Sequence, residues 1–174
     1  MKTLLRDLVT DIRMLFRVPV SAFFTVVFPS LMLIIMMASY GNPDIGSGIR
    51  LSDKYVLIAS GMGLVPLSLI TFPSWICSSV ESSYLLRLKY FHVSLARVAT
   101  SNALAHMVIA LCGTAATLAV GVLFYDTRIP GLPTLISYLL QLIVVTASLM
   151  LFGAALAFIV RQTAVAIAVG LVLM

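Results

Sequence analysis

Charged residues are scarce in this chain of 174 residues. Asp, Glu, Lys and Arg make up only 10% of the sequence, and hydrophobic residues make up 61%. A soluble domain usually carries about 25% charged residues and about 45–50% apolar residues. A soluble fold of this size has too little interior to bury so many apolar side chains. The composition therefore indicates an integral membrane protein.

Cysteine and histidine are also scarce, with two residues of each type. Cys77 and Cys112 lie inside apolar segments, where a cysteine behaves as a small hydrophobic residue. His92 and His106 have no carboxylate or thiolate at the spacing of metal ligands. The sequence therefore predicts neither a disulfide nor a metal site.

Three further absences limit the possible functions. No glycine-rich phosphate loop with a following Lys-Ser or Lys-Thr is present, so the chain is not expected to bind ATP in that way. No predicted span has Asp, Glu, Lys or Arg at its middle, which argues against a proton relay or a charge-sensing pump. No pair of catalytic residue types shares a membrane depth, so we predict no catalytic residue and disfavour an intramembrane enzyme. The net charge of +5 is spread between apolar blocks, so no nucleic-acid partner is expected.

An amphipathic segment precedes the first apolar run. At 100° per residue, the Leu, Ile, Val and Phe residues of 3–17 share one arc, and the Arg, Asp and Thr residues take the opposite side. Basic residues such as Arg6, Arg13 and Arg17 on the polar face are typical of a helix that lies in the membrane interface. A helix packed on a soluble domain is the alternative, although no soluble domain is visible. We predict an interfacial helix over residues 1–17.

Four apolar runs are long enough for a bilayer crossing, which takes about 20 helical residues. The predicted spans are residues 18–40, 55–77, 102–125 and 134–160. Residues 163–174 are apolar too, but a helix rises only about 1.5 Å per residue. This last segment is therefore too short to cross, and we expect the sequence to stop inside a fifth span of a single membrane domain, residues 1–174.

Proline and glycine interrupt two of these spans. Pro29 should kink the first span, and Gly61, Gly63, Pro66 and Pro73 interrupt the second. Such a density of breakers indicates either a bent helix that lines a path or subunit contact, or plain kinks packed against neighbours.

A few polar residues lie inside the predicted spans. His106, one turn into the third span, is expected at the membrane interface or in a hydrogen bond between helices. Gln141, Thr146 and Ser148 can line a polar path, although hydrogen bonds between helices are the favoured role.

The basic residues are unevenly divided between alternate connections. One side has Lys2, Arg6, Arg13, Arg17, Arg87, Lys89, Arg97 and Arg161, and the other has only Arg50, Lys54 and Arg128. Because Lys and Arg concentrate on the cytoplasmic side, the amino terminus and residues 78–101 are predicted to be cytoplasmic.

Residues 78–101 form a charged run between two apolar blocks. On helical geometry an apolar stripe forms, made of Tyr84, Leu88, Phe91, Leu95 and Val98. Such a stripe suits insertion into a groove on a partner protein. A connecting loop that rests on the lipid headgroups is an equally good reading of the segment alone.

The order of these segments resembles the permease subunit of type-2 family ABC exporters. The resemblance rests on the amphipathic helix that ends in Arg17-Val18-Pro19 and on the cytoplasmic segment that opens with Glu81. That segment continues through Leu85-Leu86-Arg87-Leu88 and Val93-Ser94-Leu95-Ala96-Arg97. The family usually has proline where this chain has His92, which leaves open whether the helix break found there is kept.

The resemblance implies an all-α fold of six membrane helices, paired with a second permease subunit that is identical or different. It also implies separate ATPase subunits that bind ATP and Mg, with no cofactor in this chain. The residues expected at the ATPase contact are Glu81, Tyr84, Leu85, Arg87, Leu88, Arg6 and Arg13. The implied function is export of a drug, lipid, polysaccharide or similar substrate across the bacterial inner membrane. A membrane subunit that anchors or assembles a complex without transport is the alternative.

Overall fold

The computed structural model describes residues 2–17, 23–46 and 48–173, and the side chains of residues 2–5 lie outside this description. The described residues are mostly helical and contain no strand, although one isolated bridge joins Asp44 to Arg50. The elements in chain order are α1 (Lys2–Arg17), η1 (Phe23–Val27), α3 (Phe28–Tyr40), α4 (Leu51–Pro66), η2 (Leu67–Thr71), α5 (Phe72–Glu81), α6 (Tyr84–Tyr90), α7 (Leu95–Tyr125), α8 (Leu132–Val160) and α9 (Thr163–Leu173). Here η denotes a π-helical turn, which is continuous with the α-helix that follows it.

Four continuous helices are long and apolar enough to cross a membrane. They are Phe23–Tyr40, Leu51–Glu81, Leu95–Tyr125 and Leu132–Val160. The predicted all-helical bundle with several helices of membrane-spanning length is therefore confirmed for the described residues. The second and third helices extend beyond the predicted limits of 55–77 and 102–125, because their polar ends remain helical outside the apolar run. Residues 18–22 of the first predicted span, with the Val18-Pro19 step, lie outside the described residues.

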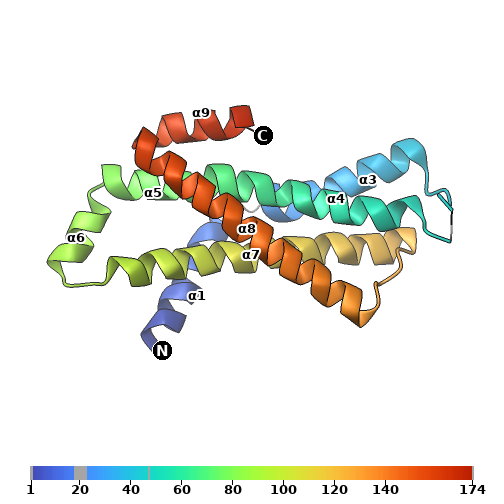
Figure 1. The fold of residues 1–174 in the computed structure, drawn as a ribbon, viewed down its shortest axis with the longest axis horizontal. Coiled ribbons are helices and arrows are strands. Elements are labelled where there is room, and N and C mark those ends of the chain that lie inside the picture. Colours follow the sequence, from blue (N-terminus) through green and yellow to red (C-terminus); the bar gives the residue numbers. More distant parts are fainter. Residues whose placement is uncertain (1, 18–22, 47, 174) are drawn as a thin grey trace.

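The helices form an elongated bundle with two different ends (Figure 1). One end has α6 and the turn between α8 and α9, and the other has the connections 41–50 and 126–131. At this second end the Asn42 amide donates to the Tyr125 carbonyl at 2.8 Å and accepts the Ser52 N–H at 3.0 Å. Asn42 thereby joins the 41–50 connection to α7 and α4.

The two π-helical turns precede the same tripeptide, Phe-Pro-Ser, at residues 28–30 and 72–74. A proline has no N–H to donate, and its ring displaces the carbonyl four residues earlier. These displaced carbonyls belong to Thr25 and Leu69. A kink at Pro29 was predicted, and the helix deviates there by a π-helical turn.

Glycines of neighbouring helices pack on the displaced carbonyls. A Cβ on Gly113 of α7 would overlap the Thr25 carbonyl oxygen, and a Cβ on Gly170 of α9 would come within 2.5 Å of the Leu69 oxygen. Gly63 of α4 lies against the Pro29 ring in the same way. Gly63 and Pro73, two of the breakers in the second span, therefore pack against neighbouring helices, as the second of the two predicted alternatives has it, whereas a Cβ on Gly61 would meet nothing within 4 Å. Leu51–Glu81 is the most buried of the four long helices.

Candidate functional site

The segment 78–101 contains a short helix, α6, between two tight turns. Ser83 before the helix and His92 after it both have left-handed backbones, with φ of 55° and 56°. At the second turn the His92 N–H donates to the Lys89 carbonyl at 3.1 Å and the Val93 N–H donates to the Leu88 carbonyl at 2.9 Å. This pair of bonds is the Schellman motif that ends a helix. The helix break therefore exists with histidine in place of proline.

The break at His92 overturns the predicted apolar stripe. Residues 84–98 are not one helix, because α7 starts anew at Leu95 with the Ser94 hydroxyl accepting the Arg97 N–H. Phe91 is 71% exposed, whereas Leu88 is half-buried. The prediction that these side chains share one face is wrong, because the left-handed backbone at His92 changes the direction of the chain and of the side chains that follow.

The outward face of α6 is apolar and aromatic. Its most exposed large side chains are Leu86 at 68%, Tyr90 at 80% and the following Phe91 at 71%. The rings of Tyr90 and Phe91 meet edge to face with centroids 5.5 Å apart. Arg87 and Lys89 are exposed beside them. This face lies at the end of the bundle, beyond the long helices (Figure 1).

A cleft of about 440 Å³ lies behind α6, between this helix, α1, α5 and the first turns of α7. Three of the residues predicted at a partner contact line this cleft: Arg6, Tyr84 and Leu88. Trp75 of α5 lines the cleft as well. The fold therefore brings residues from the amino-terminal helix and from α6 to one cleft.

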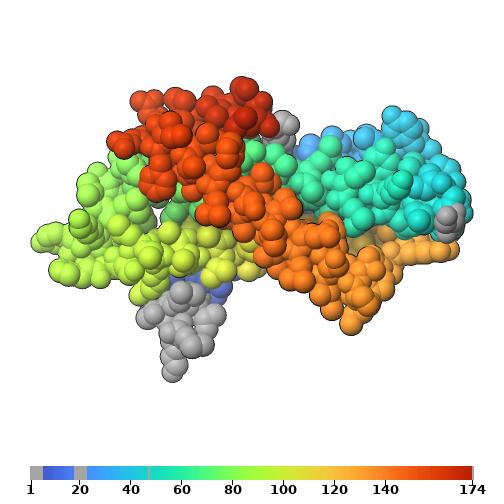
Figure 2. All heavy atoms as spheres, viewed as in Figure 1, coloured from blue at the N-terminus to red at the C-terminus, as the bar shows by residue number. Residues whose placement is uncertain are grey.

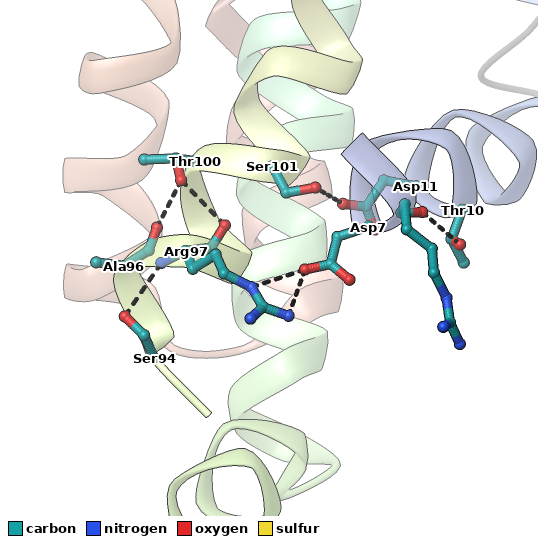
Figure 3. A network of polar contacts seen from close by, with 9 residues as sticks. Asp7, Thr10, Asp11, Ser94, Ala96, Arg97, Thr100 and Ser101 are labelled. Carbon is teal, nitrogen blue, oxygen red and sulfur yellow. Dashed lines mark hydrogen bonds and ion pairs between the residues drawn. The ribbon is translucent and has the colours of Figure 1, made fainter. Parts of the chain in front are cut away.

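Polar contacts join α1 to α7 along one side of the cleft (Figure 3). The guanidinium of Arg97 bonds the Asp7 carboxylate through Nε at 2.8 Å and Nη2 at 2.6 Å. One turn further along both helices, the Ser101 hydroxyl donates to Asp11 at 2.6 Å. The next turn of α1 places Leu15 in an apolar cluster with Ala105 and Ile109 of α7.

These contacts correct the prediction for the amino-terminal helix. Asp7 and Asp11 were placed on the wet face, but both carboxylates face α7. On the apolar arc Leu15 is buried, whereas Val9 and Phe16 are 48% and 50% exposed. The side chains of Leu4 and Leu5 lie outside the described residues. The amphipathic helix is confirmed, and part of its apolar face is covered by another helix of the same chain.

The environment of Asp11 changes its acidity. Burial raises the pKa of the Asp11 carboxyl above the ordinary value, and the hydrogen bond from Ser101 partly offsets this rise. The nearby negative charge of Asp7 raises the pKa further. Ionised Asp11 is therefore less favourable in the docked helix than in water.

The other predicted contact residues lie outside the cleft. The Glu81 carboxylate accepts hydrogen bonds from the Thr163 N–H at 2.9 Å and the Thr163 hydroxyl at 2.6 Å. Glu81 thereby caps the amino terminus of α9, where a negative charge is favourable. Arg87 donates to the Ser82 carbonyl at 2.9 Å, and Arg13 is exposed on α1. Leu85 is half-buried.

His106, Thr146 and Ser148 bond to carbonyls of their own helices. His106 is fully buried, with Nδ1 at 2.9 Å from the Asn102 carbonyl and its ring against Phe72. The hydroxyls of Thr146 and Ser148 donate to carbonyls four residues earlier. The favoured prediction of hydrogen bonds between helices is wrong for Thr146 and Ser148, because a helical hydroxyl reaches its own preceding turn first.

The contacts between Asp7 and Arg97 and between Asp11 and Ser101 were missed at the sequence level. Their signal is an acidic pair four residues apart that matches an Arg and a Ser with the same spacing. The repeated Phe-Pro-Ser tripeptide was likewise a visible sign of the two π-helical turns. Comparison of the chain with models of protein families, with curated proteins and with solved structures found no match.

Proposed function

We propose that this chain is the membrane-spanning permease subunit of an ATP-driven exporter of the type-2 ABC kind, with its amino terminus in the cytoplasm of a bacterium. In this proposal a separate subunit binds and hydrolyses ATP with Mg, and a second permease subunit completes the transporter. The observation that supports it most is α6, a short helix that stands at one end of the bundle with an apolar outward face.

The chemistry of α6 suits docking to a soluble protein. Exposed aromatic side chains are the usual anchors of a protein interface, and basic residues at the rim steer association. Leu86, Tyr90 and Phe91 supply the apolar part, and Arg87 and Lys89 supply the charge. The contact residues inferred from the structure thus differ in part from those inferred from the resemblance, since Leu88 lines the cleft behind α6 and Leu85 is half-buried.

The position of α6 also allows a movement to reach the membrane helices. Its two ends connect to α5 and α7 through turns of only a few residues. The Arg97–Asp7 ion pair ties the start of α7 to α1, and the Glu81–Thr163 contact ties the end of α5 to α9. A displacement of α6 would therefore act on four helices, which is what coupling to an ATPase requires.

The proposal is tested by replacing the outward face of α6. The full chain is co-purified with the ATP-binding cassette subunit of its host, and vanadate-sensitive ATP turnover and substrate export are measured. Leu86→Ser with Tyr90→Ser should abolish co-purification and stimulated turnover, because both anchors are lost. The matched control is Tyr40→Ser with Leu132→Ser, since these side chains are 66% and 73% exposed at the opposite end of the bundle. Equal loss in both double variants would contradict the proposal.

The test also separates transport from anchoring. A membrane anchor would bind a partner through α6 without changing ATP turnover. Co-purification of an ATPase whose turnover is the same with and without this chain would therefore favour the anchoring subunit. Reversal of Arg87 and Lys89 to Glu should uncouple hydrolysis from export while the protein still inserts, provided that the topology of the variant is unchanged.

A further inference from the structure

A wedge-shaped opening lies near the end of the bundle that is opposite to α6. Figure 1 shows that α8 crosses the other long helices obliquely, and in Figure 2 its first turns stand out from the body of the molecule. Two adjoining cavities of about 350 and 450 Å³ lie between α8, α4 and α7. They share the lining residues Val56, Leu57, Leu118 and Pro130. Both volumes fall in the range of ligand pockets, about 300–1,000 Å³.

The inner cavity offers an apolar surface. Its walls include Leu111, Ala115 and Leu139. The polar groups in the walls are already engaged: the Tyr138 hydroxyl bonds to the Ser60 hydroxyl, and the Thr114 hydroxyl donates to the Ala110 carbonyl. A ligand in this cavity would therefore be bound by apolar contacts, because these two hydroxyl groups already have hydrogen-bond partners.

The outer cavity has a cationic mouth, lined by Lys54 and Arg128. Asp53 lines the same cavity, but its two carboxylate oxygens accept the backbone N–H groups of Arg128 and Arg50, both at 2.9 Å. In the described part of the chain the ion pairs are Arg50–Asp126 and Arg97–Asp7. Lys54 and Arg128 are thus exposed cations whose charge is available to a guest.

We propose that this wedge binds an anionic phospholipid, with the phosphate between Lys54 and Arg128 and an acyl chain in the inner cavity. The helices that form the wedge are long and apolar enough to span a membrane. In a bilayer the apolar part of the wedge would face lipid chains, and its mouth, near the ends of these helices, would lie at headgroup level. A small anion would use only the mouth. A helix from a second copy would fill only the apolar part and leave two cations without a counter-charge. A phospholipid matches both parts, and the inference holds whether or not the chain serves a transporter.

The headgroup half of the proposal is tested by charge removal. The full chain is exposed to mixed micelles of phosphatidylglycerol and phosphatidylcholine, and retained lipid is counted by native mass spectrometry. Retention of phosphatidylglycerol should exceed that of phosphatidylcholine by about fivefold for each basic residue in contact. Lys54→Gln with Arg128→Gln should remove this preference. Arg50→Gln removes one positive charge at the same end but outside the cavity lining, so it should keep the preference, whereas Lys54→Gln alone, which also removes one charge, should weaken it.

The acyl-chain half is tested by filling the inner cavity. Ala115→Trp should lower the retention of both lipids, whereas Ala119→Trp should not, because Ala119 is exposed one turn further along α7 and does not line the cavity. Equal retention in the two Trp variants, with the charge effect intact, would show a plain anion site and overturn the lipid assignment. A preference that survives loss of Lys54 and Arg128 would also overturn it. Dissociation of a dimer by Ala115→Trp without lipid loss would assign the wedge to a second copy instead.

Discussion

At the scale of single residues, Asp11 carries an energetic cost that its neighbours do not remove. Its carboxylate has one hydrogen-bond donor, Ser101, while the charge of Asp7 is compensated by Arg97. Two carboxylates one turn apart repel each other when both are ionised. The pair is therefore asymmetric, since Asp7 attaches α1 to α7 and Asp11 opposes the attachment when it is charged.

This asymmetry predicts opposite effects of two similar substitutions. Because the folded pKa of Asp11 is raised, its ionisation destabilises the folded chain above that pKa, and the cost vanishes as pH falls below the ordinary carboxyl range. Asp11→Asn should therefore be more stable than the wild type at neutral pH, and the difference should shrink to zero in acid. Asp7→Asn should be less stable by about 0.5–1 kcal/mol at neutral pH, since it breaks a half-exposed ion pair.

The measurement is the thermal unfolding midpoint of the detergent-solubilised chain between pH 3 and pH 7. Wild type and Asp11→Asn should converge on acidification, whereas Asp7→Asn should lie below both at neutral pH. A constant gap between wild type and Asp11→Asn would show that Asp11 titrates normally.

The sequence could not reveal this arrangement residue by residue. The polar arc of α1 is correct as a pattern, but a pattern does not distinguish side chains that face water from side chains that face a partner helix. Asp7 and Arg97 are 90 positions apart, and only the fold brings them together. In contrast, the order of the segments did predict that Arg6 and Tyr84 lie on the same side of the membrane. Both residues line the cleft behind α6.

At the scale of elements, proline and glycine act in pairs on different helices. Each proline displaces a carbonyl, and a glycine on a neighbouring helix leaves room for that carbonyl. Small residues in membrane helices allow close backbone approach. The content of small residues therefore predicts close packing of the helices. Which helix each glycine contacts depends on the arrangement of the helices, which the sequence does not reveal.

We predict that Gly113→Ala destabilises the bundle by about 1–3 kcal/mol, the usual cost of overpacking. The added Cβ would overlap the Thr25 carbonyl, a backbone atom that cannot rotate away. Gly61→Ala is the matched control, because nothing lies within 4 Å of its added Cβ. The control should be neutral or stabilising by up to about 1 kcal/mol, since alanine is a better helix former. Unfolding midpoints of the two variants in the same detergent give the comparison, and equal midpoints would contradict the close contact.

The left-handed turn after α6 predicts how substitutions at His92 affect the structure. A left-handed backbone costs a residue with a Cβ about 1–2 kcal/mol, and glycine avoids this cost. His92→Gly should therefore keep or strengthen the turn. His92→Pro should disrupt it, because proline cannot reach a φ of 56° and has no N–H to donate to Lys89.

Amide hydrogen exchange at Val93 measures this turn directly, since that N–H donates to the Leu88 carbonyl. Protection should fall in the order Gly, His, Pro at position 92. Undiminished protection in the proline variant would show that the Val93 hydrogen bond does not depend on the left-handed backbone of residue 92. The break between α6 and α7 was left open at the sequence level because histidine is not a strong turn signal, and the left-handed φ is set by the surrounding hydrogen bonds.

At the scale of the whole molecule, the apolar runs determined the architecture to within a few residues. The fourth span was predicted as 134–160 and is Leu132–Val160. The largest error in the predicted helix limits is at the start of α7, because residues 95–101 are helical although they precede the apolar run. Those residues carry Arg97 and Ser101, so the missed helical extension and the missed contacts with α1 have one cause: a helix outside the membrane is stabilised by side-chain pairing, which hydropathy does not register.

The placement of the connections predicts a two-sided labelling pattern. Single cysteines are placed at Ile45, Ile129 and Tyr90 in a chain whose Cys77 and Cys112 are serine, and all three sites are exposed. A membrane-impermeant maleimide added to intact cells should label positions 45 and 129, whereas position 90 should react only after the membrane is opened. The reason is that Ile45 and Ile129 lie in connections at one end of the bundle and Tyr90 lies on α6 at the other, with more basic residues on the α6 side. The reverse pattern would keep the four crossings but place α6 outside the cell, where it could not meet an ATPase. Labelling of all three positions from the same side would contradict the crossings themselves.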